Sequence, residues 1–444
     1  MPGDARLSAL TVLERCRRNG AFSDDTLSRV IKSDGLDSRD AALCSNICFG
    51  TLQNQTLFDY YISAFSSVRP GKLQPKVLDI LRISVYQILF LDRVPDRAAV
   101  SEAVELCRKN GCSRASGLVN AVLRRISENK SSLPDIPGEG SAEYLSVKYS
   151  HPLWLCETLI KEKTYAFAED FFRCNNSAAP VTAQRNALKC SMDELKSALM
   201  MDGAEFFEHP WLDDCLVLSG TGDITGLRAF REGMFYIQDP AARLSVAAAG
   251  LMPGMAVLDA CAAPGGKSFA ACIAMEGRGS ITSCDIQEKK LQKIESGAAR
   301  LGFDGIISAV AMDAKTPYSA MESRYDAVIA DVPCSGLGVI RKKPEIRFKR
   351  PEEIEALPKI QLAILNGLAS CVKPGGVLVY STCTVLGREN GGTVDAFLAE
   401  HHEFEPENFT IKTAQGSYTG DRYTFWPNID GTDGFFVCRM RKAK

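Results

Sequence analysis

The sequence predicts three domains: an all-α domain over residues 1–135, a small α+β domain over 136–238, and a doubly wound, Rossmann-like α/β domain over 239–444. Three observations predict this division. Helical patterns run through residues 4–130, a Pro/Gly/Ser-rich stretch follows at 131–141, and strands alternate with helices from about residue 240. A chain of 444 residues is also long for a single hydrophobic core.

The N-terminal domain is expected to be a helical bundle. Leu7, Leu10 and Leu13 share one face of its first helix. Residues 76–92 are too apolar for a surface helix and are expected to lie at the centre of the bundle. A helix over 98–111 ends in Gly111, which suits a C-cap, and another helix covers 117–127. Residues 1–135 carry four more basic than acidic side chains, which permits an RNA partner without demonstrating one.

The middle domain mixes helices with short strands. Its first amphipathic helix, over 148–160, is entered through His151, which we expect to act as a cap. A further helix is expected over 191–201. Arg185 lies at a strand end and is a candidate phosphate contact, although a solvated sheet edge explains it equally well.

The C-terminal domain has the alternation of a mainly parallel sheet covered by helices. Helices are expected over 287–301, 352–371 and 387–400. The expected strands are 255–261, 280–285, 306–313, 325–331, 377–383 and 433–440.

Successive strands of this domain end in carboxylates: Asp259, Asp285, Asp313 and Asp331. Like charges at one sheet edge repel unless a ligand uses them. The loop after the first strand resembles a P-loop only in part, because Cys261 stands where that motif needs its first glycine. Carboxylates also disfavour a phosphate. They suit S-adenosylmethionine, which carries a sulfonium, an ammonium and ribose hydroxyls, so we expect this cofactor.

Two strand ends carry cysteine beside this edge. Cys334 follows Asp331 in a Pro-Cys-Ser-Gly turn, and Cys383 ends the strand expected to run alongside. A cytosine ring carbon is a poor nucleophile, but a thiolate that adds to carbon 6 makes carbon 5 nucleophilic. A carboxylic acid at ring nitrogen 3, the role we give Asp331, would neutralise the developing charge. The residues alone do not say which cysteine attacks.

Composition narrows the remaining alternatives. The 16 cysteines are scattered without a C-x-x-C pair, and the first residues lack the apolar core of a secretory signal, so we expect reduced thiols in a cytoplasmic protein. With four histidines and no zinc-like spacing, no metal site is expected. No apolar run reaches the length of a membrane span. We also expect the protein to be a monomer.

A basic segment follows the first reactive turn. Phosphate contacts with base stacking on an aromatic ring fit an unpaired or flipped cytosine, so we predict RNA contacts there. The residues concerned are Arg341, Lys342, Lys343, Arg347, Phe348, Lys349 and Arg350.

Four stretches resemble the motifs of RNA 5-methylcytosine methyltransferases. They are DACAAPGGK, DVPCSGLGVIRKKPEIRFKR, YSTCTVLGREN and DGFFVCRMRK. RISVYQILFLDRVPDRAAVSEAVEL and GLVNAVLRRI resemble the NusB-like domain of the bacterial RsmB (Sun/Fmu) branch, whose members methylate a cytosine of 16S ribosomal RNA. The resemblance covers nearly the whole chain.

The resemblance implies a NusB-like RNA-binding domain followed by a class I methyltransferase domain. It implies that Cys383 is the nucleophile and that Cys334 assists product release. It also implies S-adenosylmethionine contacts by Asp285, Asp313 and Asp331 and by the loop Cys261, Ala262, Ala263, Pro264, Gly265, Gly266 and Lys267. Departures from the family pattern, such as DVPC and GREN, affect loop geometry.

Two alternatives remain open. The same chemistry would act on transfer RNA or on another RNA. A NusB-like binding or assembly factor with an inactive methyltransferase half is the other alternative, and the intact set of aspartates and cysteines argues against it.

Overall fold

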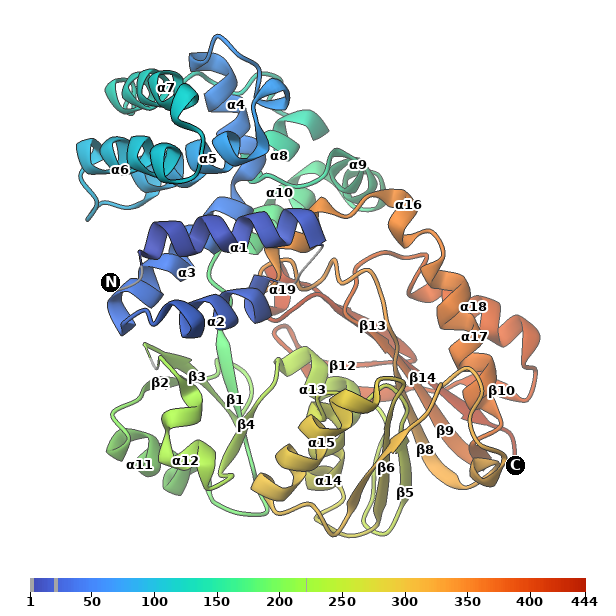
Figure 1. The fold of residues 1–444 in the computed structure, drawn as a ribbon. Helices are drawn as coiled ribbons and strands as arrows, with labels where there is room; N and C mark the ends of the chain where they lie inside the picture. Colours follow the sequence, from blue (N-terminus) through green and yellow to red (C-terminus); the bar gives the residue numbers. More distant parts are fainter. Residues whose placement is uncertain (1–3, 20–22, 221) are drawn as a thin grey trace. The chain divides into compact units, whose positions relative to one another are not determined.

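Residues 4–19, 23–220 and 222–444 are described by a computed structural model, drawn as a ribbon in Figure 1. The chain forms two compact units. The helical unit holds residues 1–177 and 340–349, and the sheet unit holds 178–339 and 350–444. Residues 340–349, which follow the Pro-Cys turn, thus belong to the helical unit, although the residues on either side of them belong to the sheet unit.

The helical unit begins with a bundle around one apolar helix, α5. This helix starts with Pro75, whose missing N–H costs nothing in a first turn, and its side chains from Val77 to Ile88 are mostly buried. It packs against α1, α3, α6 and α7, which confirms the predicted central helix. α6 ends at Lys109 with Asn110 as its C-cap, so the predicted C-cap is displaced by one residue, and Gly111 follows with φ +73°. The bundle comprises α1 (Ala5–Asn19), α2 (Ser23–Asp34), α3 (Ser38–Gln53), α4 (Gln55–Phe65), α5 (Pro75–Phe90), α6 (Asp96–Lys109) and α7 (Ser116–Glu128).

Three further helices belong to the same unit: α8 (Ala142–Tyr149), α9 (Leu153–Glu162) and α10 (Tyr165–Asn175). The division between the units therefore lies after Ser177, whereas the sequence predicts a domain boundary at 135/136. The predicted cap at His151 is wrong. Pro152 occupies the N-cap position of α9, and the His151 ring is buried, with Nδ1 2.7 Å from the Tyr149 carbonyl.

The sheet unit opens with a small antiparallel sheet in the order β2-β3-β1-β4. Its strands are β1 (Val181–Arg185), β2 (Glu205–Glu208), β3 (Cys215–Ser219) and β4 (Phe235–Ile237), accompanied by α11 (Met192–Met201) and α12 (Arg228–Arg231). Ser191 and Glu194 form a capping box that starts α11 close to its predicted position. Leu195 and Leu199 of α11 pack on Ala183 of the sheet.

The main sheet has the order β10-β14-β9-β8-β5-β6-β7. Strands β5 to β9 run parallel, and β14 pairs antiparallel with β9. The chain moves outward from β5 through β6 to β7 and then returns to β8 on the other side of β5. Ligands bind at such a reversal, at the carboxyl ends of the strands. The strands are β5 (Ala256–Asp259), β6 (Ser280–Asp285), β7 (Ile307–Ala311), β8 (Tyr325–Asp331), β9 (Val372–Thr382), β10 (Phe404–Pro406) and β14 (Phe435–Lys442).

Helices cover both faces of this sheet, as Figure 1 shows. Alternate strand residues face opposite cores: Val257 packs with α13 (Pro240–Ala247), α14 (Gly266–Ala274) and α15 (Glu288–Leu301), and Leu258 packs with α17 (Leu357–Ala369) and α18 (Gly391–Glu400). The predicted α/β layering is confirmed. The remaining elements of this unit are α16 (Pro351–Ile354), β11 (Phe409–Thr413), β12 (Gly416–Gly420), β13 (Arg422–Phe425) and α19 (Pro427–Asp430).

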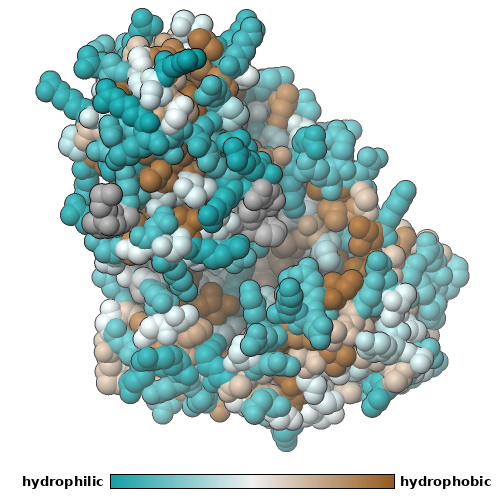
Figure 2. All heavy atoms as spheres, in the orientation of Figure 1, coloured by the Kyte–Doolittle hydropathy of each residue, from teal (hydrophilic) through white to brown (hydrophobic). Residues whose placement is uncertain are grey.

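Hydrophilic side chains cover most of the face drawn in Figure 2, with scattered apolar spots between them. Within the described residues, no helix combines the length and apolar character needed to cross a membrane.

Candidate active site

The carboxylates predicted at the edge of the sheet lie at the ends of neighbouring strands. Asp259, Asp285 and Asp331 are the last residues of β5, β6 and β8, and Asp313 lies two residues beyond β7. Asp259 is fully buried and Asp285 nearly so. The order of the sheet therefore brings these carboxylates to one edge, as the sequence predicts.

The loop after β5 leads into α14 through two glycines. Gly265 has φ +112° and caps the helix, and a Cβ at this position would lie 2.6 Å from the Phe269 ring. A Cβ on Gly266 would lie 3.0 Å from the amide of Gln238. Glycine is thus required at Gly265 both by backbone conformation and by packing. This turn presents the N-terminus of α14 at the same edge as the carboxylates.

Lys267, from the first turn of α14, is paired with Asp331. Its Nζ lies 2.6 Å from Asp331 Oδ2, and Ser381 donates to Asp331 Oδ1 at 3.0 Å. Burial opposes the charge on Lys267, but the nearby Asp331 and Asp259 carboxylates outweigh it and hold the pKa of Lys267 above its ordinary value. Lys267 is therefore a buried ammonium in the middle of the site.

Asp259 is a buried carboxyl group with incomplete hydrogen bonding. Ser268 donates to its Oδ2 at 2.7 Å, whereas Oδ1 has no hydrogen-bond partner among the described residues. Burial raises the pKa of Asp259 from 3.8 to about 6, although Ser268 and Lys267 pull it down. An unpartnered acceptor at this position is what a polar ligand at the strand edge would satisfy.

Asp259→Asn is expected to flatten the dependence of stability on pH. The folded state raises the pKa of Asp259 to about 6, so the folded protein binds a proton there more tightly than the unfolded chain does. The contribution of this proton to the free energy of unfolding is complete below about pH 4 and is lost as the pH rises through 6. The rise of the pKa from 3.8 to about 6 corresponds to about 3 kcal/mol at most. Urea unfolding without cofactor at pH 4.5 and 7.5 should show the asparagine variant gaining stability over the parent protein at the higher pH. The exposed carboxylate variant Asp395→Asn is the control, and equal pH slopes in all three proteins would contradict the assignment.

The two predicted cysteines meet. Cys334 Sγ lies 3.2 Å from Cys383 Sγ, and both are free, half-buried thiols. The turn that carries Cys334 is fixed to Cys383 by the Gly338 N–H, which donates to the Cys383 carbonyl at 2.9 Å. Gly338 can approach because it has no side chain: a Cβ there would lie 1.8 Å from the carbonyl oxygen of Gly434.

Charges of opposite sign act on the two thiols. The Lys267 ammonium interacts with Cys383, and the Glu389 carboxylate interacts with Cys334. The hydrogen bond with Cys383, burial and the negative charge of Glu389 raise the pKa of Cys334 well above its ordinary value. Loss of a proton from Cys334 is therefore disfavoured.

Cys261, also at this edge, differs from the pair. Burial and the carboxylates of Asp331, Asp259 and Asp285 raise the pKa of Cys261 above its ordinary value. A thiol that keeps its proton is a poor nucleophile, so Cys261 belongs to the wall of the site.

Three family models match the chain. "16S rRNA methyltransferase RsmB/F" matches residues 250–441, "NusB family" matches 3–128, and "Methyltr_RsmF/B-like, ferredoxin-like domain" matches 151–225. A probable ribosomal RNA small subunit methyltransferase B of Bacillus subtilis (strain 168) is 37% identical over 441 residues, which are 98% of each chain. The chain belongs to the RsmB/F methyltransferase family.

Other relatives agree with this assignment. The ribosomal RNA small subunit methyltransferase B of Erwinia tasmaniensis is 30% identical over 98% of each chain. The crystal structure of PH0851 has a TM-score of 0.82 at 26% identity and covers 99% of this chain and 98% of its own. A methyltransferase homologue from Pyrococcus horikoshii, with 23% identity and a TM-score of 0.57 over 67% of this chain and 97% of its own, shares the fold. The predicted resemblance is confirmed, and the family's cofactor is S-adenosylmethionine.

The predicted RNA contacts at Arg341 and Arg347 are wrong. Segment 340–349 belongs to the helical unit, where Arg347 is 2% exposed. Its guanidinium donates to the Ser150 carbonyl at 3.2 Å and to Asn176 Oδ1 at 3.2 Å, and it also contacts the Gln53 carbonyl. Arg341 is likewise buried. These side chains therefore anchor the segment and are not placed to meet a phosphate.

The rest of the basic segment is more accessible. Phe348 and Arg350 are exposed, and Arg350 pairs with Glu353 at 2.8 Å. Lys342, Lys343 and Lys349 are half-buried. These five residues stay predicted RNA contacts.

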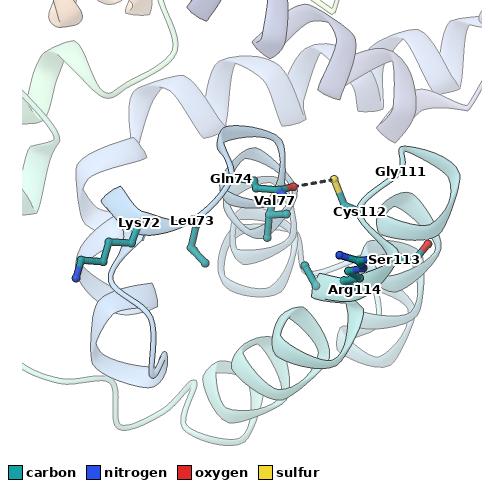
Figure 3. A pocket seen from close by; sticks show the side chains of 9 residues that line it. Lys72, Leu73, Gln74, Val77, Gly111, Cys112, Ser113 and Arg114 are labelled. Atoms are coloured by element: carbon teal, nitrogen blue, oxygen red, sulfur yellow. Dashed lines mark hydrogen bonds between the residues drawn. The ribbon is translucent and has the colours of Figure 1, made fainter.

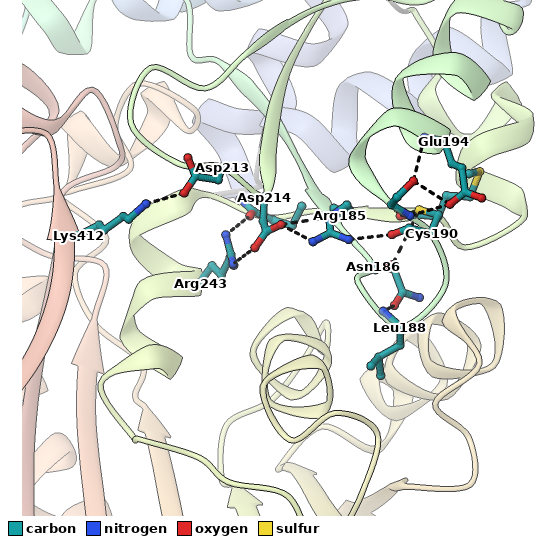
Figure 4. Close-up of polar contacts among 12 residues, drawn as sticks. Arg185, Asn186, Leu188, Cys190, Glu194, Asp213, Asp214, Arg243 and Lys412 are labelled. Carbon is teal, nitrogen blue, oxygen red and sulfur yellow. Dashed lines mark hydrogen bonds and ion pairs between the residues drawn. The ribbon is translucent and has the colours of Figure 1, made fainter.

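The half-buried Arg185 side chain is hydrogen-bonded within the small sheet. Its Nε donates to Asp214 Oδ1 at 3.0 Å and its Nη1 donates to the Cys190 carbonyl at 2.8 Å, as Figure 4 shows. Arg243 also approaches Asp214, at 3.6 Å. Arg185 therefore has structural partners within the small sheet, and it stays a predicted RNA contact.

Sequence reasoning missed Glu389 and Ile286. Glu389 lies in a loop segment, GREN, that we expected to matter only for loop geometry, and it is completely buried beside the cysteine turns. Ile286 is an apolar side chain, 63% exposed, directly after Asp285. Its exposure directly after a strand-end carboxylate makes Ile286 a candidate for contact with a ligand at this edge.

Proposed function

We propose that the protein methylates carbon 5 of a cytosine in 16S ribosomal RNA through a covalent bond between Cys383 and the base. The observation that carries this proposal is the 3.2 Å contact between Cys383 and Cys334 beside the Lys267–Asp331 pair. The ribosomal RNA target rests on the names of the full-length relatives. We expect such an enzyme to act in the cytoplasm.

The residues at the sheet edge fit S-adenosylmethionine. We assign Asp285 to the ribose hydroxyls and Asp313 to the polar edge of the base, and the exposed Ile286 to contact with the ring. The unpartnered Asp259 Oδ1 and the turn from Cys261 to Lys267 border the same edge. When bound there, S-adenosylmethionine supplies the methyl group that carbon 5 takes up.

In the first step, the Cys383 thiolate adds to carbon 6 of the cytosine. The Lys267 ammonium interacts with Cys383 and attracts negative charge on the attacking sulfur. The ring then carries extra electron density that extends to nitrogen 3. Asp331, oriented by Ser381 and Lys267, is assigned to that nitrogen, and the proton that Lys267 shares with it neutralises the developing charge.

In the last step, the methylated base must leave Cys383. Solvent water takes the proton from carbon 5, the electrons of that C–H bond form the double bond between carbons 5 and 6, and the carbon–sulfur electron pair returns to Cys383. The proton at nitrogen 3 returns to the Lys267–Asp331 pair. Cys334, which retains its proton, donates a hydrogen bond to the departing sulfur from 3.2 Å. This is the release role that we assign to Cys334.

The helical unit offers a basic hollow for the RNA. Two adjoining hollows of about 560 and 340 Å³ share Gln74, Gly111 and Cys112, and Figure 3 shows the larger one. Among the cations that line them, Lys76 pairs with Glu14 and Arg17 pairs with Asp79, whereas Arg18, Lys72 and Arg114 form no ion pair among the described residues. This excess of positive charge suits the phosphates of an RNA strand.

Lys72→Ala combined with Arg114→Ala is expected to weaken RNA binding. Both side chains are exposed, and neither forms an ion pair among the described residues. Losing two phosphate contacts should lower the slope of log affinity against log salt concentration by about 1.5 to 2. Filter binding of a 16S RNA fragment at several salt concentrations measures both the affinity and this slope.

The matched control is Arg97→Ala with Arg124→Ala. These residues line another hollow of the same unit, of about 840 Å³, where Asp96, Glu102, Glu105 and Glu128 offset the arginines. The control removes the same net charge from the protein. An equal loss of affinity and salt slope in both double variants would mean that the basic hollow is not the RNA site.

Methyl transfer to RNA tests the proposed function directly. Purified protein, tritiated S-adenosylmethionine and 16S RNA should give labelled RNA, and bisulfite sequencing of total RNA from a deletion strain should show one protected cytosine lost from 16S RNA. Loss of a protected cytosine from transfer RNA would favour the other substrate. No label in any RNA would favour an inactive binding or assembly factor.

A further inference from the structure

Glu389 is a buried carboxylate that contacts the residues next to both cysteines. It is 0% exposed, and no Lys or Arg side chain among the described residues forms an ion pair with it. Its Oε2 accepts the Ser335 backbone N–H at 2.9 Å and the Gln361 amide at 2.9 Å. Its Oε1 accepts from the Thr384 hydroxyl at 3.3 Å. A charge in this position is costly unless it is hydrogen-bonded, and these donors satisfy it.

These contacts join the two cysteine turns. Ser335 directly follows Cys334 and Thr384 directly follows Cys383, so Glu389 binds the neighbour of each thiol. The hydroxyls of Ser335 and Thr384 also lie 2.7 Å apart. Through these hydrogen bonds the carboxylate holds the two cysteine turns, and with them the two sulfurs, at a fixed separation.

Gln361 and Asn390 extend this support. Gln361, from α17, donates to Glu389 and, at 3.1 Å, to the carbonyl of Pro333, the residue before Cys334. Asn390 accepts from the Thr382 hydroxyl at 2.6 Å and donates to the Thr384 carbonyl at 3.1 Å. Both flanks of each reactive cysteine are therefore held by the same buried network.

The charge that acts on Cys334 from its neighbours is negative. Cys383 lies at hydrogen-bond distance, Glu389 contributes a negative charge, and the buried Tyr380, whose hydroxyl donates to the Glu389 carbonyl at 2.5 Å, is neutral because burial raises its pKa. The cation Lys267 acts on Cys383 and is paired with Asp331.

We propose that Glu389 is a positioning residue that holds Cys334 against Cys383 and keeps Cys334 in its neutral thiol form. The geometry of the network supports the first part, and the uncompensated negative charge on the Cys334 side supports the second. A neutral thiol is what the release step requires, because only the protonated sulfur donates to the departing Cys383. This consequence for release rests on the proposed function, whereas the state of the thiol does not.

The charge is tested without RNA. In protein carrying Cys383→Ala, alkylation of Cys334 by iodoacetamide is followed against pH by peptide mass spectrometry, with and without Glu389→Gln. The midpoint of alkylation should move about one pH unit lower in the double variant, since a buried carboxylate no longer opposes the thiolate. Asp395→Asn, an exposed carboxylate on α18, should leave the midpoint unchanged. An unmoved midpoint with Glu389→Gln overturns the proposal.

A second variant tests whether the Glu389 network holds Cys334 against Cys383. It also keeps the proposal testable if Glu389→Gln fails to fold. Gln361→Asn shortens the arm between Glu389 and Pro333 but leaves the charge in place. In protein that retains both cysteines, diamide, which takes up the two thiol hydrogens, should form the Cys334–Cys383 disulfide several-fold more slowly in this variant. An unchanged rate overturns the proposal. Neither measurement uses methyl transfer, so failure of the proposed function would be seen separately.

Discussion

Replacing Cys383 with alanine is expected to abolish methyl transfer and to leave cofactor binding intact. Without the sulfur, carbon 5 of the cytosine stays a poor nucleophile, and Cys334 cannot substitute because Glu389 and burial favour its protonated form. Removal of a covalent nucleophile typically lowers turnover by about 10⁴-fold or more. The predicted cofactor residues lie at the ends of β5, β6 and β8, in the turn after β5 and in the loop after β7, and the substitution replaces none of them.

Two measurements separate the outcomes. Tritium transfer to 16S RNA reports turnover, and equilibrium dialysis of S-adenosylmethionine reports the cofactor site. Cys174→Ala, which removes a half-buried thiol in the helical unit, is the control and should keep its turnover. Normal turnover after Cys383→Ala would refute the assignment of the nucleophile. Loss of both turnover and cofactor binding would point to a folding defect instead.

The site at the edge of the main sheet was predictable because its position follows from local patterns and one topological rule. Each strand end was visible in the sequence as a short apolar run that stops at Asp259, Asp285 or Asp331. Right-handed crossovers and parallel pairing then bring those ends to one edge. The pairing of β8 with β9, which sets Asp331 opposite Ser381, completes the meeting of the cysteines. The antiparallel direction of β14 had no comparable signal.

The basic segment shows where the sequence was insufficient. A run of cations around Phe348 is typical of an RNA-binding surface, and nothing in the run itself distinguishes Arg347 from Arg350. The difference comes from distant backbone carbonyls and Asn176, which replace water around the Arg347 guanidinium. Burial lowers the pKa of Arg347 to about 9, although Glu345 opposes it, so the group stays charged at neutral pH. The groups that compensate the burial of Arg347 are therefore far from it in the sequence, and the basic run itself does not reveal them.

Glu389 was missed for the same kind of reason. A glutamate in a loop is usually a solvated surface charge. Its burial depends on donors from three other segments, those of Ser335, Gln361 and Thr384, which only the folded sheet assembles. The sequence supplied the reactive groups, and the tertiary structure determined what holds them.

Replacing Cys334 with alanine is expected to trap the protein covalently on its RNA. Addition of Cys383 to carbon 6 and uptake of the methyl group do not need Cys334, so the adduct still forms. Its breakdown needs the carbon–sulfur electron pair to return to Cys383 inside a partly buried site. Without the Cys334 hydrogen bond from 3.2 Å, that sulfur leaves as an unassisted thiolate. The loss of a hydrogen bond to a charged group costs about 1.5 to 3 kcal/mol, which slows release by about 10- to 150-fold.

A denaturing gel of protein mixed with labelled 16S RNA and S-adenosylmethionine should show a slowly migrating band in Cys334→Ala that the parent protein lacks. The band should disappear in the double variant that also carries Cys383→Ala, because the bond is to that sulfur. A band that persists in the double variant would mean that another thiol attacks, and Cys261 would be examined next. No band in Cys334→Ala, with methyl transfer at the parental rate, would remove the release role. Because the two cysteines lie in contact yet face charges of opposite sign, opposite phenotypes from the same cysteine-to-alanine change are the most direct evidence that they divide the reaction between them.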